Sequence, residues 1–189
     1  MKTGQLYLTG FMGTGKSTVA RCLCRYYNMK QIEMDRQIEV EEGMKISQIF
    51  KEKGEAYFRK KETEFLEKIQ DQENVVVSCG GGTVMQPRNV EIMKKNGKIF
   101  LLTAQPETIL RRVKNNHDRP LLEGKKSVEA IKELMEARRP KYEAAADYQV
   151  ATDGKSDRQI CEEIINEWNT WRQARARRTA GACLPRGQA

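Results

Sequence analysis

The feature that most constrains this chain is the pattern G-x-x-x-x-G-K-S near its N-terminus, formed by residues 10–17. The run before it, residues 5–9, is apolar and β-prone, and residues 18–26 after it carry apolar side chains at helical spacing. A strand, a glycine turn and a helix start are the context of a phosphate-binding P-loop. The glycines let several backbone N–H groups point at one anion, and the helix adds its own N–H groups and positive dipole end. We therefore expect the chain to bind a nucleotide.

The residues of this segment have distinct expected roles. The Lys16 ammonium supplies a mobile cation for the β- and γ-phosphates of ATP, and the Ser17 hydroxyl is a ligand for Mg²⁺. ATP and Mg²⁺ are therefore the expected cofactors. The ATP-binding residues expected in this segment are Gly13, Thr14, Gly15, Lys16, Ser17 and Thr18.

The composition is that of one globular domain with a core of its own. Of the 189 residues, 32% are charged and 39% hydrophobic, and no apolar run approaches the ~20 residues of a membrane span. No signal-peptide pattern precedes the first strand. The five cysteines include no C-x-x-C pair, and the single histidine, His117, has no neighbouring thiol. We therefore expect free thiols in a reducing cytoplasm rather than zinc ligation or disulfides.

The net charge of +8 is concentrated at the C-terminus. Residues 172–189 contain no acidic residue and five arginines, which are Arg172, Arg175, Arg177, Arg178 and Arg186. We expect a single domain over residues 1–171 and a solvated, disordered basic tail over residues 172–189. Contact of this tail with RNA or acidic lipid is the alternative interpretation.

Beyond the P-loop, short β-prone runs alternate with amphipathic helical segments, which indicates an α/β fold. After the first strand, further strands are expected at residues 31–34, 74–78, 98–102 and 148–152. After the first helix, further helices are expected at residues 36–42, 46–53, 55–70, 88–95, 107–114, 128–138 and 157–171, with Pro140 interrupting the helix at 128–138.

Two acidic residues, Glu33 and Asp35, stand at the end of the second expected strand. Residues two apart share one face of a strand, so both carboxylates can point to one site. One would lie near Mg²⁺ and the other would contact a substrate hydroxyl. The alternative is an acidic helix start, in which Asp35 caps the helix at 36–42.

Three consecutive glycines, Gly80, Gly81 and Gly82, follow the buried strand at 74–78. Glycine leaves no side chain to pack, so the run favours close approach of the backbone to a ligand at the carboxyl edge of the sheet. A flexible turn is the alternative.

Arginines recur at separated points of the chain. Arg59 follows Phe58 in a helix, and the pair Arg138-Arg139 precedes Pro140, where a planar guanidinium suits a carboxylate or a phosphate. Arg111 and Arg112 either compensate a helix dipole or contact adenine. For each of these residues, ordinary surface charge is the alternative.

The polar segment 115–124, broken by Pro120 and Gly124, has the composition of a mobile lid, which we place at about residues 115–125. Lids over phosphoryl transfer exclude water and often carry an arginine, for which Arg119 is the candidate. We expect His117 to be a solvated residue of this lid.

Taken together, these motifs resemble those of the shikimate kinase family over about residues 4–170. The resemblance rests on residues 10–17, Asp35, Phe58-Arg59 with Glu62, the run Gly80–Gly82, Arg119-Pro120-Leu121-Leu122 and Arg138 in its R-R-P-K-Y segment. It implies a three-layer αβα sandwich with a five-stranded parallel sheet, as in P-loop nucleoside monophosphate kinases. The implied reaction moves the ATP γ-phosphoryl group to the 3-hydroxyl of shikimate, a step towards the aromatic amino acids.

The resemblance also implies roles for single residues. Asp35 would bind the ring hydroxyls and accept the reacting proton, Arg59 and Arg138 would hold the carboxylate, and the backbone of Gly80–Gly82 would line the same pocket. Arg119 would close onto the phosphates, and Arg111 would lie near adenine. The implied catalytic residues are Asp35, Lys16 and Arg119, and the expected protein is a cytoplasmic monomer acting on small molecules, without nucleic acid or membrane.

One residue departs from the family pattern. The family usually has D-x-D after its second strand, where this chain has Glu33-Met34-Asp35. The first acid is thought to reach Mg²⁺ through water, so the longer side chain of Glu33 puts the geometry around the metal in question. A gluconate kinase with the same P-loop and lid is the nearest alternative, and an RNA-associated nucleotide-binding protein is a more distant one.

Overall fold

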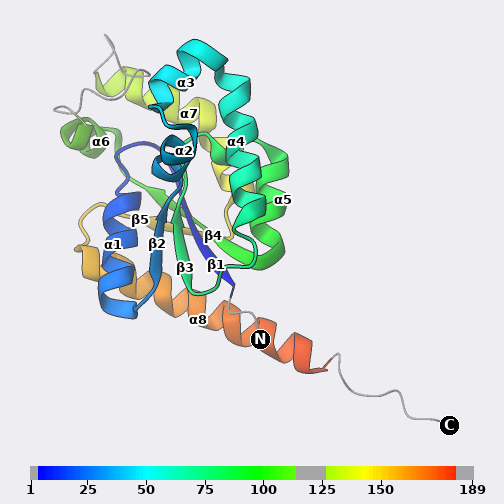
Figure 1. Cartoon of the computed structure of the whole chain (residues 1–189). Helices are drawn as coiled ribbons and strands as arrows, with labels where there is room; N and C mark the ends of the chain where they lie inside the picture. The colour runs from blue at the N-terminus through cyan, green and yellow to red at the C-terminus, as the bar shows by residue number, and fades with distance from the viewer. Residues whose placement is uncertain (1–3, 114–126, 182–189) are drawn as a thin grey trace.

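Five short parallel strands form the central sheet of the computed structural model, which describes residues 4–113 and 127–181 (Figure 1). The strands are β1 (Gln5–Thr9), β2 (Lys30–Glu33), β3 (Val75–Ser78), β4 (Gly97–Thr103) and β5 (Tyr148–Ala151). Their order in the sheet is β2-β3-β1-β4-β5, and every neighbouring pair is parallel. The expected five-stranded parallel sheet is therefore confirmed.

Helices connect successive strands, as parallel pairing requires. They are α1 (Lys16–Tyr27), α2 (Met34–Glu42), α3 (Ile46–Lys53), α4 (Glu55–Lys68), α5 (Pro87–Asn96), α6 (Pro106–Val113), α7 (Val128–Ala145) and α8 (Asp157–Gly181), with the 3-10 turn η1 (Thr83–Met85). Local sequence explains several ends: Pro87 opens α5, where its missing N–H costs nothing, and Gly43 closes α2 with a positive φ of 66°. The Ser127 hydroxyl accepts from the N–H of Ala130 and caps α7.

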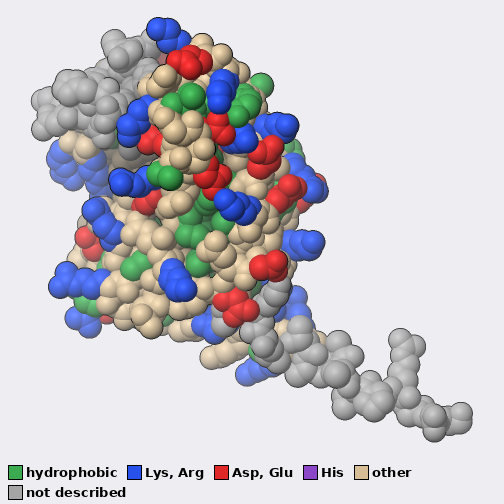
Figure 2. All heavy atoms as spheres, viewed as in Figure 1, with side chains coloured by type: hydrophobic (Ala, Val, Ile, Leu, Met, Phe, Trp, Pro, Cys, Tyr) green, Lys and Arg blue, Asp and Glu red, His purple; other side chains and the backbone are tan. Residues whose placement is uncertain are grey.

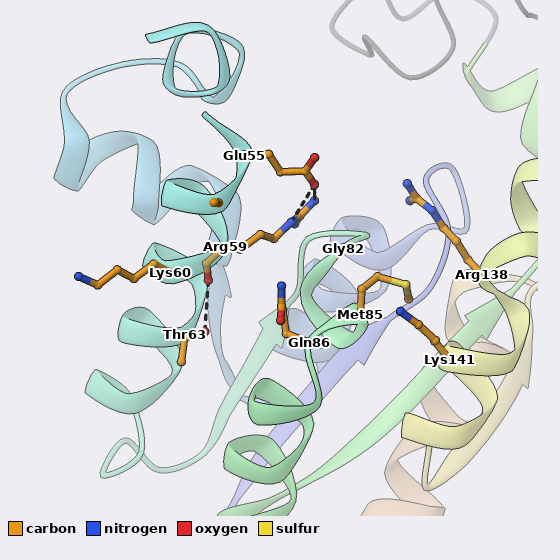
Figure 3. Close-up of a pocket in the computed structure, with 10 residues that line it drawn as sticks. Glu55, Arg59, Lys60, Thr63, Gly82, Met85, Gln86, Arg138 and Lys141 are labelled. Carbon is orange, nitrogen blue, oxygen red and sulfur yellow. Dashed lines mark hydrogen bonds and ion pairs between the residues drawn. The ribbon is translucent and has the colours of Figure 1, made fainter. Parts of the chain in front are cut away.

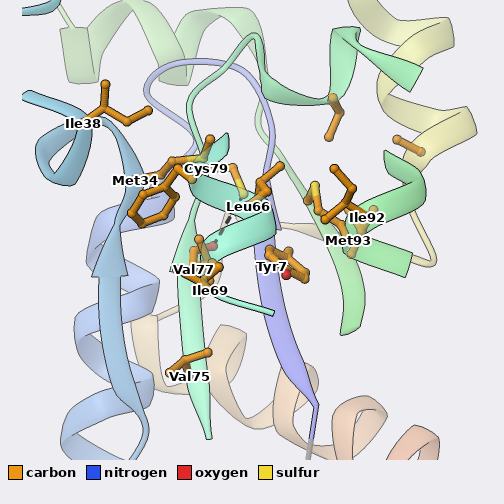
Figure 4. Packing of buried hydrophobic residues seen from close by; sticks show 14 of the residues in the cluster. Tyr7, Met34, Ile38, Leu66, Ile69, Val75, Val77, Cys79, Ile92 and Met93 are labelled. Carbon is orange, nitrogen blue, oxygen red and sulfur yellow. Dashed lines mark hydrogen bonds between the residues drawn. The ribbon is translucent and has the colours of Figure 1, made fainter. Parts of the chain in front are cut away.

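The three central strands β3, β1 and β4 are buried on both faces, so their alternate residues belong to different layers. On β1, Tyr7 packs with residues of α2, α4 and α5, among them Met34, Leu66 and Ile92 (Figure 4). Its neighbours Leu6 and Leu8 pack on the other face, against α1 and α8. The result is the expected three-layer sandwich.

The boundaries of α2 and α7 differ from those expected. The helix α2 begins at Met34, so Asp35 lies in its first turn rather than at the end of a strand. The helix α7 does not stop before Pro140 but continues to Ala145. Proline in a helix interior costs about 3 kcal/mol. Here the last turn is held by packing, because Tyr142 and Ala145 are both buried against the core.

The helix α8 runs ten residues past its expected end at Trp171. The rings of Trp168 and Trp171 stack with their centroids 4.9 Å apart, and the Arg175 guanidinium lies 5.2 Å from the Trp171 ring centroid. Arg175 also donates to the side-chain oxygen of Asn96 at 3.2 Å. These contacts fix the next helical turn, and α8 continues to Gly181, so residues 172–181 are helical where a disordered tail was expected. Residues 182–189 lie outside the described ranges.

No helix within the described ranges is both long and apolar enough to cross a membrane. Figure 2 shows basic and acidic side chains interspersed over the visible surface of α3 and α4. Several of them pair, including Lys53 with Glu42 at 2.7 Å and Lys68 with Glu41 at 2.7 Å.

An ion pair with a buried lysine joins α8 to the sheet and gives a first prediction. Lys98 on β4 pairs with Glu167, and the Lys98 side chain is only 7% exposed. We expect Glu167→Ala to lower the free energy of unfolding by about 2 kcal/mol, because the Lys98 charge loses its partner in a largely buried position.

Urea denaturation measures this effect, and Glu163→Ala on the same helix is the matched control. Glu163 pairs with Lys155 at 2.5 Å, but both side chains are about one-third exposed, so its loss should cost only about 0.5 kcal/mol. Equal destabilisation by the two substitutions would contradict the burial argument.

Candidate active site

Three functional segments meet at the carboxyl edge of the sheet because β1 lies between β3 and β4, and β2 lies beside β3. The P-loop follows β1, Asp35 follows β2, and the run Gly80–Gly82 follows β3. Carboxyl ends of parallel strands at a change of strand order are the usual ligand position in α/β sheets. The sheet order therefore brings together residues that are far apart in the sequence.

The side chain of Lys16 folds back onto the backbone of the P-loop. Lys16 Nζ donates to the carbonyl oxygens of Gly10 at 2.8 Å and of Phe11 at 3.1 Å. The buried Thr14 hydroxyl donates to the same Phe11 oxygen at 2.8 Å. Gly15 has a φ of +99°, and no heavy atom outside its chain neighbours lies within 4 Å of the position that a Cβ would take. The loop therefore presents an open backbone surface at the N-terminus of α1, which suits a phosphate.

Ser17, in the first turn of α1, contacts the first of the two acidic residues. Its hydroxyl donates to Glu33 Oε2 at 3.0 Å, and the Gln31 side-chain amide donates to the other Glu33 oxygen. Gln31 and Glu33 lie two apart on β2 and share one face, as expected for a strand. The side chain of Glu33, which is longer than the aspartate usual in the family, thus reaches Ser17, the residue expected to bind the metal.

The contact between α6 and the P-loop comes from Arg112. Its NH1 group donates to the Gly13 carbonyl at 3.1 Å and lies 3.2 Å from the hydroxyl of Thr152, just after β5. Arg111, the residue expected near adenine, is exposed one position earlier on the same helix. Of the two arginines considered in the sequence, it is therefore Arg112 that contacts the P-loop.

The glycine run is crowded by the chain's own side chains. A Cβ at Gly80 would lie 2.6 Å from Asp35 Oδ1, and a Cβ at Gly82 would lie 2.3 Å from Arg59 NH1. A Cβ at Gly81 would lie 3.6 Å from the Tyr142 hydroxyl and 3.8 Å from the Gly10 carbonyl oxygen. Glycine is thus required at positions 80 and 82 to seat Asp35 and Arg59.

A pocket of about 640 Å³ opens between α4, the turn after β3, and α7. Figure 3 shows Arg59 and Arg138 reaching into it from α4 and α7, with Gly82 between them. Its wall is formed by Glu55, Ala56, Arg59, Lys60, Thr63, Gly82, Met85, Gln86, Arg138 and Lys141. Two arginines from distant segments therefore face one cavity.

Arg59 is held by two carboxylates of its own helix. Its NH1 group pairs with Glu62 at 2.7 Å, and its NH2 group pairs with Glu55 at 2.7 Å. Glu62 is completely buried, while the Glu55 side chain is 64% exposed. Burial raises the pKa of the Glu62 carboxyl, and the neighbouring Arg59 charge and the Thr83 hydroxyl oppose this rise.

Tyr142 connects α7 to the glycine run. Its buried hydroxyl donates to the Gly81 carbonyl at 2.5 Å. Burial raises the pKa of this hydroxyl, while the positive charge of the nearby Arg138 opposes the rise. The hydrogen bond fixes the helix turn that carries Arg138 against the end of β3.

Sequence reasoning attached no role to Glu62, Tyr142 or the Arg112 contact. Glu62 follows Arg59 at the i, i+3 spacing of helical ion pairs, so that pair was visible in the sequence. The contacts of Tyr142 and Arg112 depend on tertiary packing. The expected lid at about 115–125, with Arg119 and His117, falls within residues 114–126, outside the described ranges.

Comparison with known proteins identifies similar chains. The family model described as shikimate kinase matches residues 12–169. The shikimate kinase of Sulfurihydrogenibium sp. is 46% identical over 162 residues, which is 86% of this chain and 96% of that protein. The shikimate kinase of Persephonella marina is 45% identical over 160 residues, covering 85% of this chain and 96% of that protein.

Solved structures agree with these sequence matches. The structure of shikimate kinase from Acinetobacter baumannii in complex with shikimate has a TM-score of 0.81 and 30% identity, covering 88% of this chain and 93% of that chain. A gluconokinase from Sinorhizobium meliloti has a TM-score of 0.61 at 16% identity, covering 93% and 97% of the two chains, and shows the shared fold alone.

The buried Glu62 carboxyl gives a prediction about pH. Its pKa in the folded protein lies above the ordinary value of 4.5, so the folded chain binds this proton more tightly than the unfolded chain. Its contribution to stability is therefore fully present below about pH 4.5 and is lost as the pH rises through the folded pKa. We expect the free energy of unfolding of the unmodified protein to fall, relative to Glu62→Gln, as the pH rises above 4.5.

Urea denaturation at several pH values measures this difference. Glu64→Gln is the control, because Lys61 lowers the pKa of Glu64 and its contribution is instead lost as the pH falls. Parallel pH profiles for the unmodified protein and Glu62→Gln would contradict the prediction.

Proposed function

Because this chain belongs to the shikimate kinase family, we propose that it transfers the γ-phosphoryl group of ATP to the 3-hydroxyl of shikimate, giving shikimate 3-phosphate and ADP. This reaction is a step of the pathway to chorismate and the aromatic amino acids. The observation that carries the proposal is the pair Arg59 and Arg138, which face one pocket beside a P-loop. A small acid with a hydroxyl to be phosphorylated fits this combination of charges.

The P-loop is the proposed ATP site. The backbone N–H groups of residues 13–18 would bind the phosphates at the N-terminus of α1. Lys16 would exchange its present bonds to the Gly10 and Phe11 carbonyl oxygens for phosphate oxygens. Arg112 stabilises the loop through the Gly13 carbonyl, and we propose that it, together with the exposed Arg111, borders the nucleoside side of the site.

The residues present fit an Mg²⁺ ion. No cluster of three or more potential ligands from histidine, cysteine, aspartate and glutamate occurs in the described part of the chain. Such a cluster is not needed, because Mg²⁺ bound with a nucleotide keeps several waters and takes few protein ligands. Ser17 would bind the ion directly, and Glu33, 3.0 Å from its hydroxyl, would act through water. When bound, the ion neutralises phosphate charge during transfer.

The acceptor would lie in the pocket between Arg59 and Arg138. A guanidinium can bind a carboxylate through two parallel hydrogen bonds, so the two arginines would fix the acid group of shikimate. The backbone of Gly80–Gly82 would line the same site. Asp35, whose Oδ1 would lie 2.6 Å from a Cβ at Gly80, would bind the ring hydroxyls and accept the proton of the reacting one.

Catalysis of phosphoryl transfer depends mainly on positioning and charge neutralisation. Asp35 would position the attacking hydroxyl, and Lys16 would neutralise charge on the transferred group. Arg119 is the proposed third catalytic residue, closing onto the phosphates with its lid. We further propose that the protein acts in the cytoplasm as a monomer, without nucleic acid; its large exposed hydrophobic residues in the described ranges, Tyr26 and Val40, lie on different helices.

Release of ADP from ATP and Mg²⁺ tests the proposed reaction. Shikimate, gluconate and AMP are compared in parallel with a reaction that contains no acceptor. We expect turnover only with shikimate. Turnover with gluconate or AMP, but not with shikimate, would overturn the proposed acceptor and leave the P-loop assignment standing.

The paired arginines give a prediction with a matched control. Arg138→Ala should weaken shikimate binding by about 2–4 kcal/mol, because the carboxylate of shikimate loses one of its two proposed charged partners. Arg139 is the adjacent residue but is exposed and pairs with Glu136, so Arg139→Ala should leave shikimate affinity unchanged. Isothermal titration calorimetry measures both, and equal affinity of the Arg138→Ala variant and the unmodified protein would remove Arg138 from the site.

A further inference from the structure

A chain of hydrogen bonds joins α4 to η1 and α5 behind the pocket. The Thr63 hydroxyl lies 2.7 Å from Asn89 Oδ1, and Asn89 Nδ2 donates to the Thr83 carbonyl at 2.9 Å. The Thr83 hydroxyl donates to Glu62 Oε1 at 2.6 Å, and Glu62 Oε2 accepts from Arg59 at 2.7 Å. This series of hydrogen bonds therefore begins and ends on α4, and it passes through the turn that follows the glycine run.

The direction of each bond in this chain is fixed by its neighbours. Because Asn89 uses its amide nitrogen on the Thr83 carbonyl, its oxygen faces Thr63 and accepts the hydroxyl proton. The ionised Glu62 carboxylate can only accept, so Thr83 must be the donor. Asn89, Thr83 and Glu62 are all fully buried, so water does not replace a bond that is lost.

Asn89, Thr83 and Glu62 do not form the wall of the pocket, yet they control a group that does. Arg59 is shared between two carboxylates, the buried Glu62 and the largely exposed Glu55. Without a fixed Glu62, the interaction with Glu55 would draw the guanidinium towards solvent. The orientation of Glu62 thus decides whether Arg59 stays over the Gly82 backbone.

We propose that Asn89 and Thr83 are positioning residues for the acceptor. They orient the Glu62 carboxylate, which holds the Arg59 guanidinium over Gly82, where it meets the carboxylate of the substrate. The inference rests on the proposed function and adds to it a residue of α5, thirty positions from Arg59 in the sequence. According to this inference, recognition of a substrate that carries a carboxylate depends on the buried hydrogen bonds as well as on the residues of the pocket wall.

The decisive variant is Thr83→Val, which keeps the shape of the side chain and removes only the hydroxyl donor. We expect the KM for shikimate to rise about tenfold, the effect of losing one hydrogen bond to a charged group, while the KM for ATP is unchanged. Thr83→Ser keeps the donor and should restore the KM for shikimate. Asn89→Leu should also raise the KM for shikimate.

A pH profile separates positioning from a purely structural role. The Thr83 hydrogen bond lowers the pKa of Glu62, so its removal raises that pKa further. A protonated Glu62 no longer attracts Arg59. On acidification, the KM for shikimate should therefore begin to rise at a higher pH in Thr83→Val than in the unmodified protein.

Two results would overturn the inference in distinguishable ways. If the unmodified protein turns over shikimate and Thr83→Val melts at a lower temperature with an unchanged KM for shikimate, the network supports the fold alone. If the unmodified protein shows no turnover with shikimate, the proposed function fails, and the inference that rests on it fails with it.

Discussion

The position of β1 between β3 and β4 is the constraint on which the rest of the structure depends. It places the P-loop beside the glycine run, so a Cβ at Gly81 would lie within 4 Å of both the Gly10 carbonyl oxygen and the Tyr142 hydroxyl. The P-loop, which forms the proposed ATP site, and the glycine run, which lines the proposed acceptor site, therefore lie next to each other. A site built on strand ends and helix starts is held more rigidly than one built on long loops, and phosphoryl transfer requires such positioning.

The acceptor side depends on a charge that the protein's own ion pairs hold in place. Arg59 is 20% exposed and already pairs with Glu62 and Glu55, while its guanidinium covers the Gly82 backbone. Burying the Glu62 carboxylate opposes its ionisation, and the adjacent guanidinium and the Thr83 hydroxyl compensate part of that effect. A guanidinium fixed in this way loses less conformational entropy on binding a carboxylate.

Much of the fold could be predicted from sequence, because strand and helix periodicity and the P-loop are local signals. Packing overrode the local signals elsewhere: contacts of Trp171 and Arg175 extend α8, and burial of Tyr142 carries α7 through Pro140. For the site, sequence motifs such as the P-loop name the residue types that we propose, because these motifs are local patterns. Which of Arg111 and Arg112 touches the P-loop depends on the rotation of α6, and the glycine run seats Arg59 and Asp35 rather than leaving open space.

The central claim is that the acceptor is recognised by its carboxylate, between Arg59 and Arg138. Isothermal titration of the nucleotide-free protein with shikimate, and in parallel with its methyl ester, tests this claim most directly. The ester keeps the ring and the hydroxyls but has no negative charge. The account predicts that the ester binds at least about 30-fold more weakly, in line with the loss of charge-assisted bidentate hydrogen bonds. Equal affinity for the acid and the ester would contradict it.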